Sequence, residues 1–392
     1  MLSWEFPPRV TGGVAAHVSG LAAGLARAGH DVVVLTVADR PAELDAVPPP
    51  RVRVLRTTVD MPWFPPSEIV SRVASANHAV TKLGSRFEGE LAGWTPDLVH
   101  GHDWQLGWAA DSLAFQYGVP FVLTMHGTER VRHGGQLPLG APADINSIEW
   151  WLAYQADRLI SPTRFVVEQL VTGFELLPDH VVHIPNGVDP DQWRATTDPA
   201  TPTGPRPPLV VSWGRVQYEK GFQVLARAMH ELRGRVPDVH AVIAGRGSYL
   251  PELQTQIDVE GVSDLVSLPG FLNDSELRDL VHRAGCVVIP SLYEPFGIVA
   301  LEALAAGAPL IVARTGGLAE LVAGTHAGVT FEPGNPDDLA LAIENVLTNH
   351  ELATILVANA RDLVAKKYAW DAIARATADV YADVLDRARR TT

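Results

Sequence analysis

Short apolar runs alternate with longer segments of helical periodicity along almost the whole chain of 392 residues. The runs that are typical of buried strands are 31–37, 52–55, 97–100, 120–125, 157–160, 181–184, 208–213, 239–244, 266–268, 286–289, 309–312 and 328–331. Strands that alternate with helices form parallel sheets, and ligands bind at the carboxyl ends of those strands. The pattern therefore predicts an α/β fold, with its site in the segments that follow strands.

The first predicted helix has apolar residues at every third or fourth position from Val14 to Ala28. This is the period of a helix with one buried face, and Gly29 is expected to end it. Only residues 1–3 precede the loop that begins at Trp4, although the first strand of such a domain is usually central. That strand is therefore expected to be either a stub or incomplete.

A segment without apolar periodicity, 194–208, separates two series of strands and helices. It contains five prolines together with threonine and glycine, which is typical of a linker. We therefore expect two Rossmann-like domains, 1–193 and 209–369, that face each other across a cleft. The last helix, 370–392, carries one apolar stripe and is expected to return to the first domain.

Composition excludes several classes of protein. The formal net charge is -14 and both halves of the chain are acidic, so a nucleic-acid groove is not expected. Cys286 is the single cysteine, which excludes an internal disulfide and fits a reducing, cytoplasmic location. No apolar run is long enough to span a membrane, whereas contact with a membrane surface stays open.

Two carboxylates flank a helix start in the segment SLYEPFGIVALEALAAG, residues 291–307. Glu294 follows a predicted strand, and Gly297 and Ile298 begin the next helix, whose free N–H groups favour an anion. Glu302 lies within the helix, where an unpaired carboxylate would be costly. A carboxylate accepts two hydrogen bonds side by side, as the vicinal diol of a ribose requires. The alternative is one helix-start charge and one incidental buried glutamate.

Two further strand-to-helix junctions could meet phosphates. Gly12 and Gly13 precede the first helix, where glycine lets an anion approach the backbone, although a tight turn explains them equally well. Arg215 and Lys220 follow the first strand of the second domain and could neutralise a diphosphate without a metal. The alternative for these two cations is an ordinary solvated surface.

The histidines differ in what they indicate. His126 ends a predicted strand at its carboxyl edge, which favours a functional role over a core role. His100, His102 and Asp103 have the composition of a metal site, but no His-Glu-x-x-His motif or partner cysteine accompanies them. We therefore expect no metal. A dinucleotide-dependent dehydrogenase is also disfavoured, because the first junction lacks Gly-x-Gly-x-x-Gly.

Taken in order, these segments resemble the family 4 retaining glycosyltransferases of the GT-B fold over nearly the whole chain. The most specific match is the Glu-x7-Glu segment with its Pro-Phe-Gly. The segments SWEFPP and HDW are most similar to glycogen and starch synthases, and to actinobacterial α-glucan glucosyltransferases in particular. The matching pieces are SWEFPPRVTGG, HGHDW, MHGT, IPNGVD, GRVQYEKG, IAGRG, SLYEPFGIVALEALAAGAPLI and TGGLAEL.

The resemblance implies a nucleotide-sugar donor, a carbohydrate acceptor and no resident cofactor. It implies acceptor binding in 1–193 and donor binding in 209–369, with the product keeping the donor's α configuration. It implies that Gly13, Arg215 and Lys220 contact the donor diphosphate, and that Ile298 and Val299 donate backbone N–H groups. It also implies that Glu294 binds sugar hydroxyls, that Glu302 binds the ribose and that His126 lies near the transferred hexose.

The acceptor side and the chemical details stay open. His102, Asp103 and Trp104 are the acceptor-side candidates. Glycogen synthases carry a lysine two residues before their Gly-Gly pair, where this chain has Val10. The expected reaction moves glucose from UDP- or ADP-glucose to an α-glucan, as in glycogen biosynthesis. The alternatives are a mannosyl- or glucosyltransferase acting on a lipid or small molecule, and a non-catalytic sugar-nucleotide-binding protein.

Overall fold

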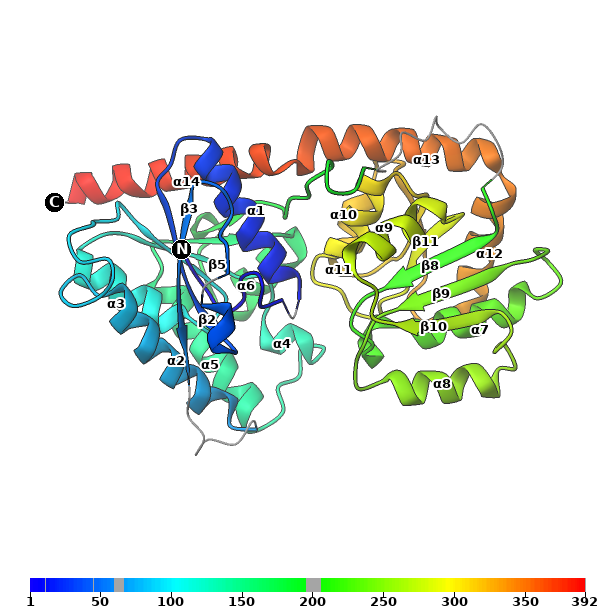
Figure 1. The fold of residues 1–392 in the computed structure, drawn as a ribbon, viewed down its shortest axis with the longest axis horizontal. Coiled ribbons are helices and arrows are strands. Elements are labelled where there is room, and N and C mark those ends of the chain that lie inside the picture. Colours follow the sequence, from blue (N-terminus) through cyan, green and yellow to red (C-terminus); the bar gives the residue numbers. More distant parts are fainter. Residues whose placement is uncertain (11, 45, 60–66, 195–205, 392) are drawn as a thin grey trace. The chain divides into compact units, whose positions relative to one another are not determined.

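The structure, a computed structural model, describes residues 1–392 except 11, 45, 60–66, 195–205 and 392. The chain forms two compact units (Figure 1). Unit 1 contains Met1–Gly187 and Trp370–Thr392, and unit 2 contains Val188–Ala369. Most of the segment expected as a linker lies outside the described residues. The unit boundary at Gly187 precedes the expected one by a few residues.

Unit 1 is built on a parallel sheet whose described strands follow the order β3-β2-β1-β4-β5-β6-β7. Its central strand β1 has only two residues, and Leu2 pairs with Leu35 on one side and Gly101 on the other. The short strand expected before Trp4 is therefore present and central. The strands are β1 Leu2–Ser3, β2 Val32–Ala38, β3 Val52–Thr58, β4 Val99–His102, β5 Phe121–Thr124, β6 Arg158–Ser161 and β7 Val181–His183.

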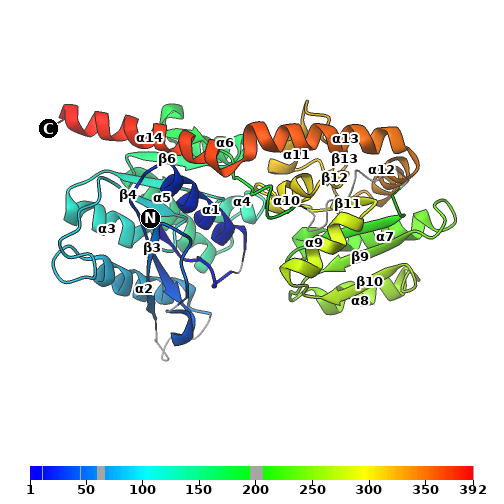
Figure 2. The same cartoon turned by 45° about the horizontal axis from the view of Figure 1, so that its top comes forward.

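Helices cover both faces of this sheet. Helices α2, α3 and α5 pack together on one face, and α1 packs against α14 on the other, as Figure 2 shows from a second direction. Gly29 adopts a φ of +99° just after α1, as expected for the glycine that ends a helix. The helices are α1 Gly13–Arg27, α2 Ile69–Gly84, α3 Gly107–Tyr117, α4 Glu129–Arg132, α5 Ala141–Gln155, α6 Arg164–Gly173 and α14 Trp370–Thr391.

Unit 2 repeats the architecture with the strand order β10-β9-β8-β11-β12-β13, also parallel. Helices α7, α8 and α12 pack on one face, and α9, α10 and α11 pack on the other. The strands are β8 Leu209–Trp213, β9 His240–Ala244, β10 Val266–Gly270, β11 Cys286–Ile289, β12 Leu310–Ala313 and β13 Gly328–Phe331. The helices are α7 Phe222–Leu232, α8 Leu250–Val259, α9 Asp274–Arg283, α10 Ile298–Ala306, α11 Gly316–Val322, α12 Pro336–Thr348 and α13 His350–Leu363.

Both sheets confirm the predicted α/β fold of two Rossmann-like units. In each sheet the direction in which successive strands are added reverses once. The reversal lies between β1 and β4 in unit 1 and between β8 and β11 in unit 2. Such a reversal opens a crevice at the carboxyl ends of the two strands, where ligands of open α/β sheets bind. Within the described residues, no helix is both long and apolar enough to cross a bilayer.

Candidate functional site

An ion pair joins the two loops at the strand reversal of unit 2. Lys220 lies in the loop after β8, and its Nζ is 2.7 Å from Oε2 of Glu294, in the loop after β11. Only 21% of the Lys220 side chain and 13% of the Glu294 side chain are exposed. The Ser291 hydroxyl lies 3.4 Å from the same carboxylate oxygen. The structure therefore brings together two of the residues expected to form the site.

The two loops touch through their backbones. Gly221 has a φ of +70°, and a Cβ on it would lie 1.9 Å from the carbonyl oxygen of Pro290. The N–H of Leu292 donates a 2.8 Å hydrogen bond to the carbonyl of Glu219. A glycine is therefore required at position 221, and this close contact fixes Lys220 beside Glu294.

The helix that follows Glu294 begins with a glycine. Gly297 caps α10 with a φ of +91°, and a Cβ there would lie 2.4 Å from Leu318 Cδ2. The N–H groups of Ile298 and Val299 belong to the first turn of α10 and have no acceptor within the helix. They form the free helix start that the sequence predicts, and anion binding by these N–H groups stays a prediction.

The start of α11 supports the same loop. The N–H of Gly317 donates to the carbonyl of Glu294 at 3.1 Å, and the Thr315 hydroxyl lies 3.4 Å from the carbonyl of Leu292. The turn at Thr315 therefore positions the Glu294 backbone.

Glu302 is held from the neighbouring strand. Trp213, the last residue of β8, donates its indole N–H to Oε2 of Glu302 at 3.3 Å. Trp193 stacks on the Trp213 ring, with a centroid distance of 6.0 Å and an interplanar angle of 27°. Although part of its side chain stays exposed, burial of the carboxyl raises the pKa of Glu302 to about 7, with a smaller contribution from the charge of Asp274. The bond to Trp213 opposes this shift.

Arg215, the second expected cation, is exposed in the loop after β8. In the part of the chain that the structure describes, it forms no ion pair. It is therefore available to an anionic ligand at lower cost than Lys220, which already has a carboxylate partner.

The glycine pair of unit 1 has an internal partner. Gly13 is the first residue of α1, one residue before the expected start at Val14, and Gly12 is its N-cap in extended backbone. The N–H of Gly12 donates to the Glu5 carboxylate at 3.0 Å. One N–H of this expected phosphate site is thus bound to a carboxylate of the same loop.

His126 and Asp103 lie together at the carboxyl edge of unit 1. The backbone N–H of His126 donates to Oδ1 of Asp103 at 2.8 Å. Burial raises the pKa of Asp103 to about 7 and lowers the pKa of His126 to about 4, so the imidazole is neutral at neutral pH. Asp103 therefore fixes the backbone that carries His126.

The His126 ring meets the rings of two further histidines, His17 and His102. His17 of α1 lies with its ring centroid 4.5 Å from that of His126 and 5.4 Å from that of His102, which ends β4. His17 and His102 are 3% and 1% exposed, and burial lowers the pKa of both well below its usual value. His100 differs, because its ring nitrogens hydrogen-bond with Tyr381 and Thr124.

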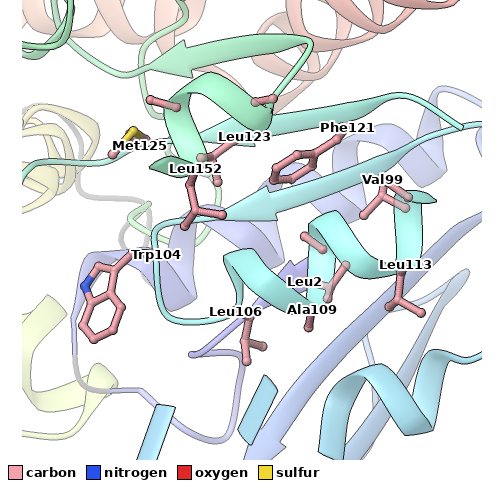
Figure 3. Close-up of a cluster of buried hydrophobic side chains, with 14 of the residues drawn as sticks. Leu2, Val99, Trp104, Leu106, Ala109, Leu113, Phe121, Leu123, Met125 and Leu152 are labelled. Carbon is pink, nitrogen blue, oxygen red and sulfur yellow. The ribbon is translucent and has the colours of Figure 1, made fainter. Parts of the chain in front are cut away.

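Trp104 packs inside unit 1. It is 5% exposed and belongs to the core cluster with Leu106 and Leu152 (Figure 3). Of the three acceptor-side candidates, Trp104 packs in this core, His102 lies in the histidine cluster and Asp103 holds His126. Their acceptor roles stay predictions.

Sequence reasoning missed His17 and Glu5. His17 was part of the apolar period of the first helix, and a histidine on a buried face is itself a signal, because buried polar groups need a partner. Glu5 lies in a loop whose shape depends on contacts that no local pattern reports. The indole of Trp213 was also missed as the partner of Glu302.

Comparison with known proteins is consistent along the whole chain. A family model described as Glycosyltransferase Family 4 matches residues 11–192, and one described as Glycosyl transferases group 1 matches residues 194–363. Over 392 residues the chain is 36% identical to a glycogen synthase of Mycobacterium tuberculosis, covering 97% of this chain and 93% of the relative.

Two further proteins are similar over the same extent. An uncharacterized glycosyltransferase of Methanocaldococcus jannaschii is 34% identical, with 97% of each chain covered. The solved structure of sucrose-phosphate synthase from Thermosynechococcus elongatus aligns with a TM-score of 0.80 at 24% identity, covering 96% of this chain and 94% of that chain. At that identity the likeness shows the fold alone.

Proposed function

Because the chain belongs to the family 4 glycosyltransferases and has their GT-B fold, we propose that it is a retaining enzyme that moves glucose from UDP- or ADP-glucose to an α-glucan or related glucoside. The observation that carries this proposal is the Lys220–Glu294 pair beside the start of α10, at the strand reversal of unit 2. The 36% identity with a protein named glycogen synthase supports the glucan acceptor.

The diphosphate of the donor would be bound by cations and backbone donors of unit 2. Negative charge develops on the leaving diphosphate in the transition state, and fixed donors aimed at it lower the barrier. Arg215, Lys220 and the N–H groups of Ile298 and Val299 are the proposed donors. The Lys220 ammonium has three N–H bonds, so it can keep its bond to Glu294 while donating to a phosphate. Gly12 and Gly13 are proposed as a further backbone contact.

The sugars would be held by carboxylates. We propose that Glu294 binds sugar hydroxyls and that Glu302 binds the ribose diol. Trp213 donates to Oε2 of Glu302, so Oε1 is not used by that bond. Because both carboxylates then bind hydroxyls, neither is available as a base. The oxygen of the departing phosphate therefore takes the proton of the acceptor hydroxyl, on the same face of the sugar. Neutral His126 is proposed to hydrogen-bond the transferred hexose. This mechanism needs neither a carboxylate nucleophile nor a metal cofactor.

A donor panel tests the proposal. UDP-, ADP- and GDP-glucose and GDP-mannose would each be offered with glycogen, in excess EDTA, and the anomeric proton of the product would be followed by NMR. We expect an α-linked glucosyl product. A β-linked product, or activity that EDTA removes and Mg²⁺ or Mn²⁺ restores, would contradict the assigned roles.

The same donors, offered also with lipid and small-molecule acceptors, separate the alternatives. Transfer only to a lipid or small-molecule glycoside would replace the glucan acceptor. Donor binding in a thermal-shift assay without transfer or hydrolysis would indicate a sugar-nucleotide-binding protein that is not an enzyme.

A further inference from the structure

We propose that His17, His102 and His126 form a three-imidazole site for a divalent ion of the Zn²⁺ type, and that filling this site inhibits the enzyme. The ion is an inhibitor in this proposal and takes no part in transfer. The binding half of the proposal stands on the geometry of unit 1, whereas the inhibition half rests on the role of His126 in the proposed function.

The three side chains converge from separate elements. His17 comes from α1, His102 from the end of β4 and His126 from the segment after β5, and one ring nitrogen of each lies within 4.8 Å of the others. Ligands of a tetrahedral Zn²⁺ at about 2.0–2.1 Å lie about 3.4 Å apart. The separations here, at most 4.8 Å, exceed that spacing by no more than about 1.4 Å, so the rings would have to turn to close the site.

Five of the six ring nitrogens have no hydrogen-bond partner among the described residues. Both nitrogens of His17 and of His102, and Nε2 of His126, are buried without a hydrogen bond among the described residues. The Asn186 side chain faces His17, but its oxygen also lacks a bond of acceptable geometry. Buried polar atoms almost always have a hydrogen-bond partner, so five unpaired nitrogens in one place indicate that a ligand binds there. A cation that accepts three lone pairs would bind three of them, one on each ring.

The neighbouring histidine shows the contrast. His100 packs against His102 with a ring-centroid distance of 4.3 Å, yet its two nitrogens lie 2.6 Å from the Tyr381 hydroxyl and 2.8 Å from the Thr124 hydroxyl. Both ring nitrogens of the buried His100 therefore have hydrogen-bond partners. The rings of His17, His102 and His126 lie nearby and, within the described part of the chain, lack such partners at five of their nitrogens.

The ligand set selects the class of ion. Three imidazoles without a carboxylate suit Zn²⁺, Co²⁺, Ni²⁺ or Cu²⁺, whereas Mg²⁺ and Ca²⁺ require oxygen ligands. The His17 ring is oriented by packing against Trp370, at a centroid distance of 5.5 Å, and not by a hydrogen bond. Because loss of such orienting bonds typically weakens metal affinity about 10–100-fold, we expect reversible binding and not a permanently held ion.

Occupation would take His126 away from the sugar. Its Nε2 is buried without a hydrogen-bond partner among the residues that the structure describes, and a bond from this atom to the ion would use its lone pair. An imidazole held by an ion also cannot turn toward a substrate. Zinc would therefore lower the transfer rate without affecting Lys220 or Glu294 of unit 2.

Cobalt spectroscopy tests the site without reference to activity. Co²⁺ would be added to the EDTA-treated, dialysed full chain, and we expect the visible bands of a low-coordinate cobalt site to saturate at one ion per chain. Zn²⁺ should abolish these bands and Mg²⁺ should not. His17→Phe should remove the bands, whereas His78→Ala, at an exposed histidine of α2, should leave them unchanged.

A measurement on the unaltered chain covers the case in which His17→Phe does not fold. Ring-nitrogen NMR of the 14 histidines during a Zn²⁺ titration should show shifts confined to three of them at one equivalent. Absence of stoichiometric binding, equal binding of Mg²⁺, or cobalt bands that persist in folded His17→Phe would overturn the site.

Transfer assays test the inhibition separately. Zn²⁺ should inhibit the wild-type enzyme over the concentration range that saturates the site, and EDTA should restore the rate. His17→Phe, if folded, should keep transfer activity that Zn²⁺ no longer inhibits. Zinc that binds without inhibition would overturn the inhibitory role alone. Absence of transfer with every donor would refute the proposed function, while the cobalt and NMR results would still decide the site.

Discussion

At the scale of single residues, Glu302 shows how burial prepares a carboxyl for a ligand. Its pKa of about 7 means that the carboxyl is largely neutral below neutral pH in the free protein. A ribose diol is best bound by the ionised form, which accepts two hydrogen bonds. Binding of the nucleotide therefore has to select the charged form of a group that burial keeps partly neutral.

We expect nucleotide affinity to rise with pH through about 7. Below that pH the affinity should fall by up to about tenfold per pH unit, because the protonated fraction of Glu302 must first ionise. Calorimetric titration with UDP and ADP between pH 5.5 and 8.5 measures this. Glu302→Gln should bind weakly and without the pH dependence, whereas exposed Glu351→Gln should behave as wild type. A pH-independent affinity in the wild type would contradict the ribose assignment.

The same group should affect stability with a defined sign. Because the folded pKa of Glu302 lies above its usual value of 4.5, the folded state binds more protons between pH 4.5 and 7. Its contribution to the free energy of unfolding therefore declines as pH rises through that window. The difference in stability between wild type and Glu302→Gln, measured by urea unfolding, should shift toward the variant as pH increases. A difference that is flat with pH would show that the carboxyl is solvated.

The Lys220–Glu294 pair leads to a prediction about catalysis. Lys220→Ala and Glu294→Ala should each lower kcat by about 10²–10³ with the fold retained. Lys220 is proposed to contact the leaving diphosphate and Glu294 the hydroxyls of the transferred sugar, and both groups change in the transition state. Circular dichroism and transfer assays would be run together. Arg227→Ala breaks an exposed ion pair with Glu260 on the same unit, at 3.3 Å, and should leave kcat unchanged. Full activity in Lys220→Ala or Glu294→Ala would remove the pair from the site.

At the scale of elements, the sequence predicts strands and helix ends well because their causes are local. The start of α10 after Gly297 and its end at Gly307, which has a φ of +70°, follow from glycine in a left-handed conformation. Contacts between elements are a different matter. No periodicity indicates that the Gly12 N–H meets Glu5 or that the Lys220 ammonium meets Glu294, because these distances depend on how two loops pack.

Gly221 tests the contact between the loops after β8 and β11. Gly221→Ala should destabilise the protein by more than Gly261→Ala and should also weaken donor binding. Both glycines have similar positive φ values, +70° and +66°, so both variants carry the backbone strain of about 1–2 kcal/mol. Only at Gly221 would the new Cβ also meet a backbone oxygen, that of Pro290.

Urea unfolding and nucleotide titration of the two variants decide the matter. If Gly221→Ala and Gly261→Ala lose equal stability and Gly221→Ala binds the donor normally, the two loops are not in the close contact that positions Lys220.

At the scale of the whole molecule, the chain leaves unit 1 and returns to it. The last helix, α14, belongs to unit 1 although more than 180 residues of unit 2 precede it, and its Trp370, Ile373 and Val384 share a core with α1. The amphipathic stripe was visible in the sequence. The return of this helix to the first domain was expected, but its packing on α1 was not, because an apolar face does not specify which surface covers it.

Trp370 connects this helix to the glycines of unit 1. A Cβ on Gly20 would lie 2.1 Å from the Trp370 indole, and one on Gly187 would lie 2.6 Å from it, so the ring fills space that these glycines leave. Trp370→Ala should therefore cost about 3–5 kcal/mol, as for other large-to-small changes in a core. Phe115→Ala on α3 is the matched control, since its ring is 88% exposed and should change stability by less than about 0.5 kcal/mol.

Calorimetry shows where that loss falls. Each unit has its own hydrophobic clusters, so we expect Trp370→Ala to lower the unfolding temperature of unit 1 and to leave that of unit 2 in place. A saturating nucleotide should identify the transition of unit 2 by raising it, because a ligand stabilises the unit that binds it. If Trp370→Ala lowers the nucleotide-sensitive transition by the same amount as the other, the two units unfold as one, and α14 stabilises the whole chain and not unit 1 alone.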